Sequence, residues 1–139
     1  MDFTLNLFPN RQAIHFVDQT MTNFTDIYNI PSKRELCFVV HELVINAIEA
    51  MHQADLTNRA KIQVHVSQDE EAIKVTVIDQ AEGIPEKDWR SILKFDCEEL
   101  NYSDRGRGLL FVKNMVDDIW FENVSETKFL VGVLKKLNV

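Results

Sequence analysis

Residues 35–50 read ELCFVVHELVINAIEA, and their spacing predicts a long amphipathic helix that begins near Ser32 and ends near Ala54. Apolar residues recur at three- and four-residue intervals, so they form one broad face: Leu36, Val39, Val40, Leu43, Val44 and Ala47. Glu42 and Asn46 are four residues apart, so they project together from the border of this face, and Glu49 follows. Such a pair is either an ordinary solvated flank or part of a site, and the helix alone favours the flank.

The segments around this helix predict an α+β fold. Ser32 and Glu35 form a candidate capping box for the long helix, and Asn10 is a candidate cap for an earlier one. Alternating apolar residues predict strands, and helical spacing predicts a short helical piece and a later helix from Gly108. The expected strands are 3–8, 61–67, 72–78, 118–123 and 128–135, and the short helical piece is 87–93. This order favours a two-layer α/β sandwich with a mixed, mostly antiparallel sheet covered on one face by helices, in a single domain over residues 1–139.

Composition and charge exclude several classes of protein. The chain has 139 residues, of which 45% are hydrophobic, enough for one core and unlike a disordered tail. Its net charge of −7 disfavours binding to nucleic acid. No apolar run approaches the roughly 18 residues that cross a bilayer, and the N-terminal residues lack the plan of a signal peptide. With only Cys37 and Cys97, far apart in sequence, we expect a cytoplasmic protein that does not associate with membranes.

A second polar motif follows a predicted strand. Residues 75–84 read VTVIDQAEGI, in which the strand ends at Asp79 and a turn contains Gly83. A carboxylate at a strand end can accept a hydrogen bond from the exocyclic amine of adenine. Aspartate also commonly ends strands in turns, so this motif alone is weak.

A third motif opens the predicted later helix. Residues 104–112 read DRGRGLLFV, and paired glycines at a helix start let the backbone approach a phosphate, toward which helix N–H groups point. Arg105 and Arg107 add two cations to an otherwise acidic chain. Phe111 occupies the place of the third glycine of a dinucleotide fingerprint, and no Gly-Lys-Ser/Thr follows, so the Rossmann and P-loop sites are excluded.

Together and in this order, the three motifs resemble those of the Bergerat-fold (GHKL, histidine kinase-like) ATPases, a superfamily that includes gyrase B, histidine kinases and MutL proteins. The length of the chain and residues 106–117 (GRGLLFVKNMVD) are most similar to the bacterial anti-sigma factor serine/threonine protein kinases. The resemblance implies an ATP-dependent kinase that phosphorylates an anti-anti-sigma partner and sequesters a sigma factor or a similar regulator. Relatives of this kind often form homodimers through sheet edges, which makes residues 3–8 a candidate for such pairing.

The resemblance also implies a role for each motif. Asn46 would hold Mg²⁺ beside the phosphates of ATP or ADP, and Glu42 would be the general base. Asp79 would bind the adenine amine. The remaining candidate cofactor-binding residues line the base pocket or the phosphate lid: Gly83, Ile84, Arg105, Gly106, Arg107, Gly108 and Leu109.

Two departures from the family pattern keep other functions open. Ala81 occupies the place of the first glycine in the usual Asp-x-Gly-x-Gly, and Glu49 is close to the expected phosphate site. One alternative is therefore a nucleotide-binding interaction module that regulates a partner, such as a phosphatase, without kinase turnover. The other is an α+β scaffold that binds no nucleotide.

Overall fold

The computed structural model describes residues 1–94 and 104–137, without the side chains of residues 104–107. In chain order its elements are β1 (Asp2–Leu7), α1 (Arg11–Ile27), α2 (Lys33–Gln53), β2 (Ile62–Gln68), β3 (Ala72–Asp79), α3 (Glu86–Lys94), α4 (Asp104–Lys113), β4 (Asp118–Ser125) and β5 (Lys128–Lys136). The predicted strands and the first two helices are thus confirmed, and most of their ends lie within one or two residues of the predicted ones.

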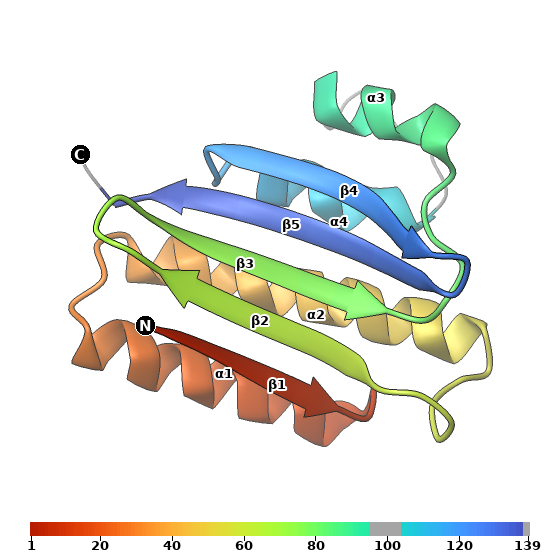
Figure 1. The fold of residues 1–139 in the computed structure, drawn as a ribbon, viewed down its shortest axis with the longest axis horizontal. Helices are drawn as coiled ribbons and strands as arrows, with labels where there is room; N and C mark the ends of the chain where they lie inside the picture. The colour runs from red at the N-terminus through yellow and green to blue at the C-terminus, as the bar shows by residue number, and fades with distance from the viewer. Residues whose placement is uncertain (95–103, 138–139) are drawn as a thin grey trace.

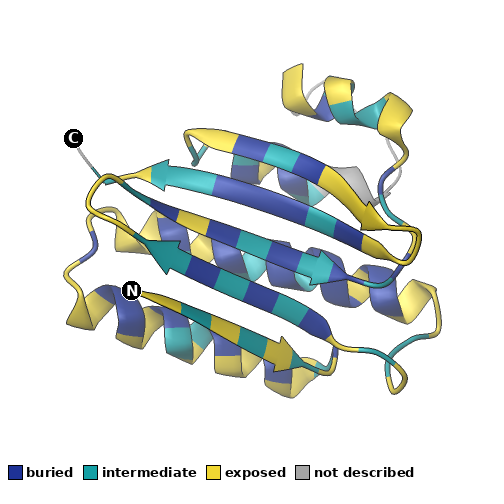
Figure 2. Ribbon diagram, viewed as in Figure 1, coloured by how far each residue is buried: buried dark blue, intermediate teal, exposed yellow. Residues whose placement is uncertain are grey.

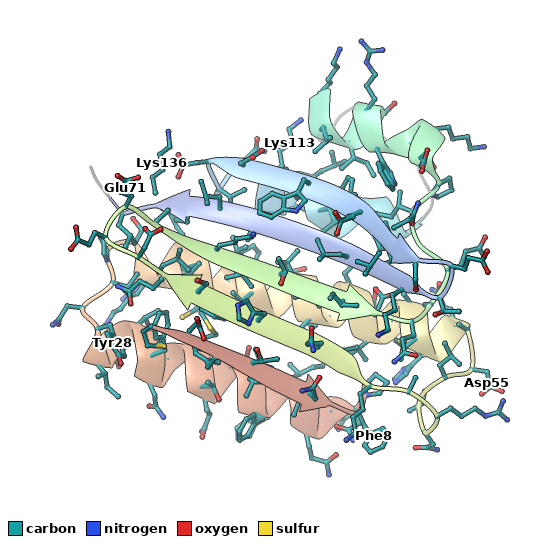
Figure 3. All side chains as sticks on the ribbon, viewed as in Figure 1. Phe8, Tyr28, Asp55, Glu71, Lys113 and Lys136 are labelled. Atoms are coloured by element: carbon teal, nitrogen blue, oxygen red, sulfur yellow. The ribbon has the colours of Figure 1, made fainter. Side chains whose placement is uncertain are left out.

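The described strands form one sheet in the order β1-β2-β3-β5-β4, and helices α1, α2 and α4 cover one of its faces (Figure 1). The opposite face is uncovered, and Figure 3 shows its side chains toward the viewer. The predicted α+β sandwich is therefore confirmed. The sheet is antiparallel throughout, however, whereas the sequence favours a mixed one. The reason is that the α1–α2 pair returns the chain to the end where β1 finished, and β5 folds back between β3 and β4.

The core lies between the sheet and the helices (Figure 2). Every second residue of β2 and β3 is buried on this side, as the alternation predicts. Helix α2 lies at the centre of the helical layer and carries the largest share of buried helical residues. Because such packing leaves α2 little freedom to move, the polar residues at the border of its apolar face have fixed positions.

The two predicted helix caps have different outcomes. Asn10 caps α1, since its Oδ1 accepts the Ala13 N–H at 3.0 Å. The capping box at Ser32 is wrong, because Ser32 has a left-handed φ of 57° and its side chain makes no capping hydrogen bond. Glu35 instead pairs with Lys135 of β5, whose Nζ lies 2.9 Å from Glu35 Oε2 and donates to the Met115 carbonyl at 2.6 Å. Lys135 thus connects the first turn of α2 with the residues that follow α4.

Helix α4 begins at Asp104, four residues before the predicted start at Gly108. No described glycine has a positive φ, so the glycines of α4 adopt ordinary helical conformations. A glycine inside a helix costs about 1 kcal/mol relative to alanine. The fully buried Leu109, Leu110 and Val112 offset this cost by packing into the core.

The β2–β3 turn depends on Asp69. Its Oδ1 accepts the N–H groups of Glu71 and Ala72 at 2.7 and 2.9 Å. These two backbone hydrogen bonds, the one from Ala72 more strongly, lower the pKa of Asp69. At the same end of the sheet, where Glu71 and Lys136 lie close together (Figure 3), the Leu137 N–H donates to the Glu71 carbonyl at 2.8 Å and connects β5 to this turn.

Candidate functional site

One side of α2 carries a row of polar and small residues. Asn46 is buried, with 9% of its surface exposed, and Glu42 is half-buried one turn earlier. Ala50 and Gln53 continue the same row toward the C-terminal end of the helix. The row therefore extends along half the length of α2, beside the apolar face that fixes the helix.

The first turns of α4 lie beside the start of this row. A Cβ atom built on Gly108 would be 3.5 Å from Glu42 Oε2, an ordinary van der Waals distance. Helices α2 and α4 also pack against each other. The first and third sequence motifs are therefore in contact.

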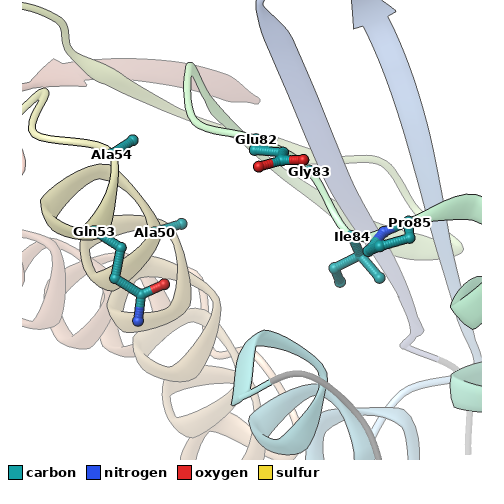
Figure 4. Close-up of a pocket in the computed structure, with 7 residues that line it drawn as sticks. All are labelled: Ala50, Gln53, Ala54, Glu82, Gly83, Ile84 and Pro85. Carbon is teal, nitrogen blue, oxygen red and sulfur yellow. The ribbon is translucent and has the colours of Figure 1, made fainter.

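A pocket of about 310 Å³ lies at the other end of the row. Helix α2 forms one wall, and the loop that follows β3 forms the other (Figure 4). Its lining residues are Ala50, Gln53, Ala54, Glu82, Gly83, Ile84 and Pro85. The second motif thus faces the same side of α2 as the first and third.

Asp79 ends β3 and is almost fully buried, with 1% of its surface exposed. Its Oδ1 accepts the Ala81 N–H at 3.0 Å. This hydrogen bond shapes the turn into residues 80–85, the loop between β3 and α3 that we call the pocket loop. The backbone N–H of Gln80, the residue between Asp79 and Ala81, donates to Met51 Sδ on α2 at 3.2 Å. These contacts hold the end of β3 against the C-terminal half of α2.

The pocket loop approaches β5 so closely that Gly83 has no space for a side chain. A Cβ on Gly83 would lie 2.4 Å from Cδ1 and 2.7 Å from Cγ of Phe129. Phe129 is itself 1% exposed and stacks on Phe121 with ring centroids 6.1 Å apart. Packing against this ring, with no ligand involved, already requires glycine at position 83.

The other predicted site residues have mixed placements. Ile84 lines the pocket, whereas Leu109 is fully buried and its side chain packs in the core. Gly106 belongs to the first turns of α4, and the side chains of Arg105 and Arg107 lie outside the described residues.

The structure adds pocket residues that the sequence reasoning did not single out. Gln53 and Ala50 were missed, although their seven- and four-residue spacing from Asn46 places them on the same helix face. Pro85 was missed because no motif includes it. Glu49 is exposed on the flank of α2, and Ala81 is buried, with 8% of its surface exposed.

The donor set fits a magnesium ion that is held mainly by a nucleotide. Among the residues that the structure describes, no three His, Cys, Asp or Glu side chains gather closely enough to form a metal cage. Magnesium at phosphate sites takes few protein ligands and completes its shell with phosphate oxygens and water. The amide oxygen of Asn46, one helical turn from Glu42, is a hard oxygen of the kind that would hold such an ion.

The sequence profile of the histidine kinase-like ATPase domain matches residues 12–131. The chain belongs to the histidine kinase-like ATPase family. This confirms the Bergerat-fold resemblance over nearly the whole chain. In the part of this ATPase domain that the structure describes, no helix is both long and apolar enough to span a membrane.

Solved structures share the fold of this ATPase domain. A chain of the SiaB–SiaC complex from Pseudomonas aeruginosa is 16% identical, with a TM-score of 0.67 over 96% of this chain and 89% of that one. The catalytic domain of the histidine kinase ThkA is 19% identical, with a TM-score of 0.61 over 99% and 97%. The mycobacterial sensor histidine kinase MprB is 12% identical, with a TM-score of 0.57 over 98% and 97%. A comparison with curated protein sequences gave no match.

Proposed function

We propose that this chain binds Mg²⁺–ATP and transfers the γ-phosphate to a serine or threonine of a small partner protein, in the manner of an anti-sigma factor kinase. One observation carries the proposal: the three motifs meet along one side of α2. Glu42 lies beside Gly108 at one end of the row, and the pocket wall that contains Gly83 lies at the other. Asn46 lies between them.

The two ends of the row suit the two ends of a nucleotide. Asp79, Gly83 and Ile84 belong to the segment around the pocket, where a base would bind. The first turns of α4 carry backbone N–H groups that suit phosphates, and Arg105 and Arg107 add positive charge to this stretch of the sequence. Mg²⁺, held by Asn46 when bound, would neutralise phosphate charge in a domain that carries a net charge of −7.

Glu42 is the candidate general base. The partner's hydroxyl oxygen would form a bond to the γ-phosphorus while the bond between that phosphorus and the β–γ bridging oxygen breaks. The hydroxyl proton would pass to the carboxylate of Glu42, and ADP would leave. Glu42 is half-buried and next to the first turns of α4, so it is near the expected phosphates and still accessible from outside.

The proposed partners are an anti-anti-sigma factor as substrate and a sigma factor or similar regulator as the protein that is sequestered. The match to a chain of the SiaB–SiaC complex supports a protein partner, because that fold is seen there in a complex of two proteins. A second candidate function is a nucleotide-dependent interaction module without kinase turnover. Ala81 favours it, since this residue is buried beside Asp79, where the family pattern has glycine.

Calorimetric titration of ATP and ADP, with and without Mg²⁺, tests the nucleotide site. We expect the wild-type chain to bind ATP more tightly with Mg²⁺, and Asn46→Ala to weaken that binding at least about tenfold. Asn23→Ala is the matched control, because Asn23 is an exposed helical asparagine on α1. If the wild-type chain binds no nucleotide at millimolar concentration, both candidate functions are excluded.

Phosphate transfer from radiolabelled ATP to candidate partners, such as proteins encoded by neighbouring genes, separates the two functions. We expect Glu42→Gln to abolish transfer and to retain ATP binding. If Glu42→Gln retains the full regulatory effect on the partner, and ATP binding persists, the chain is a module and not a kinase.

A further inference from the structure

Helix α3 directly follows the pocket loop and is tied back to it by Trp89. The indole Nε1–H of Trp89 donates to the Ile84 carbonyl at 2.7 Å. Ile84 is buried, with 3% of its surface exposed, and lines the pocket. The hydrogen bond therefore acts on the backbone of the wall that faces α2.

The ring of Trp89 belongs to an aromatic cluster with Phe121 and Phe129. Its centroid lies 5.8 Å from that of Phe121 and 6.2 Å from that of Phe129. Phe129 is also the ring against which Gly83 packs. Consecutive residues of the pocket loop are thus held by adjacent members of one cluster, Gly83 by contact with Phe129 and Ile84 by the hydrogen bond from Trp89.

Further contacts hold α3, the helix that carries Trp89, in place. The Asp88 N–H donates to the Pro85 carbonyl at 2.8 Å, and Asn123 Nδ2 of β4 donates to Glu86 Oε1 at 3.2 Å. Ile92 is fully buried at the other end of the helix. Because α3 is held in place, the hydrogen bond from Trp89 to the Ile84 carbonyl also fixes the backbone of the pocket wall.

We propose that Trp89 is a positioning residue for the nucleotide pocket, which holds the Gly83–Ile84 backbone in its binding-competent place before the ligand arrives. This inference rests on the proposed nucleotide-binding function. A ligand that must first order a loop binds more weakly, because the apparent Kd rises in inverse proportion to the fraction of molecules in the competent state. Loss of the Trp89 hydrogen bond lowers that fraction.

The chain supplies a matched control, because it contains two tryptophans. Trp120 lies on the uncovered face of the sheet, flat against Gly132, where a Cβ would be 2.3 Å from its Cε2. It is next to Phe121 on β4 but points to the opposite face, away from the cluster. Trp120→Phe therefore changes an indole without changing the pocket wall, and it leaves Trp89 as the sole tryptophan fluorophore.

The experiment measures the Kd for Mg²⁺–ATP and the Tm of the wild-type chain, Trp89→Phe and Trp120→Phe, together with Trp89 emission in Trp120→Phe. Trp89→Phe keeps an aromatic ring and removes the N–H donor. We expect it to weaken ATP binding roughly three- to tenfold, the range for loss of one hydrogen bond, with the chain still folded at the temperature of the titration. Trp120→Phe should bind ATP like the wild-type chain, and the emission maximum of its Trp89 should not shift as ATP saturates the site, because the pocket wall is already in place.

Unchanged ATP affinity in Trp89→Phe, or a shift of the Trp89 emission maximum on saturation with ATP, overturns the inference while the wild-type titration still supports the proposed function. Absence of ATP binding by the wild-type chain overturns both, and it is seen before any variant is made. If Trp89→Phe fails to fold, the emission of Trp89 in Trp120→Phe decides alone.

Discussion

Gly83→Ala tests the packing of the pocket loop against the aromatic cluster. The new Cβ would be 2.4 Å from Phe129 Cδ1, about 1 Å closer than ordinary van der Waals contact. Phe129 cannot move aside easily, because it is 1% exposed and packs against both Phe121 and Trp89. Overpacking of this kind costs about 1–3 kcal/mol.

For a domain of 139 residues, this cost corresponds to a fall in Tm of roughly 4–12 °C. Thermal unfolding followed by circular dichroism, checked by urea titration, measures it. Gly108→Ala is the matched control, because its Cβ would be 3.5 Å from Glu42 Oε2 and α4 is helical there. We expect that control to retain its stability or to gain up to about 1 kcal/mol from helix propensity.

A second substitution identifies the cause of the destabilisation. In a Phe129→Leu background, Gly83→Ala should cost at least about 1 kcal/mol less than it does in the wild-type chain, because the opposing ring is gone. If Gly83→Ala has the Tm of the wild-type chain, or costs the same in both backgrounds, the reasoning about this contact is refuted.

Three further predictions concern α4, β5 and the β2–β3 turn. Gly108→Ala should weaken Mg²⁺–ATP binding in calorimetry although it leaves the fold intact, and unchanged affinity would show that this glycine is not needed for the phosphates. Lys135→Met should lower the free energy of unfolding in urea by about 1 kcal/mol, because it removes hydrogen bonds to Glu35 and to the Met115 carbonyl. A change within error would mean that solvent replaces both. Asp69→Ala should destabilise the fold near pH 7, and the difference from the wild-type chain should vanish as the pH falls below 3.8 and through the lower folded-state pKa of Asp69. A difference that persists in acid would contradict that origin.

Most of the fold could be predicted from the sequence, because local rules and packing agree there. Alternation along β2 and β3 and the spacing of α2 gave the right elements and faces. Ser32 was mispredicted because its capping role depends on a backbone φ that the residue type does not determine. The start of α4 was mispredicted because tertiary packing of Leu109 and Leu110 outweighs the low helix propensity of the glycines.

The candidate site could be predicted from the sequence only where a single motif contains both the functional residues and the spacing that brings them together. Glu42 and Asn46 share a helix face by spacing alone, whereas the position of Gly108 beside Glu42 depends on the packing of α4 against α2. The support behind the pocket could not be predicted, because Trp89 and Phe129 are 40 residues apart in sequence. Their meeting depends on the strand order β3-β5-β4, which no local pattern encodes.

The strand order also sets when the pocket can exist during synthesis. β5 lies between β3 and β4, so it must enter the sheet after both of its neighbours have been made. It also carries Phe129, the ring that supports Gly83. A nascent chain still attached to the ribosome at residue 120 therefore has all three motifs but not the surface on which the pocket loop rests. Nucleotide binding, which can stabilise a folded state, becomes available only after the last described strand has emerged, so it cannot guide the earlier steps of folding.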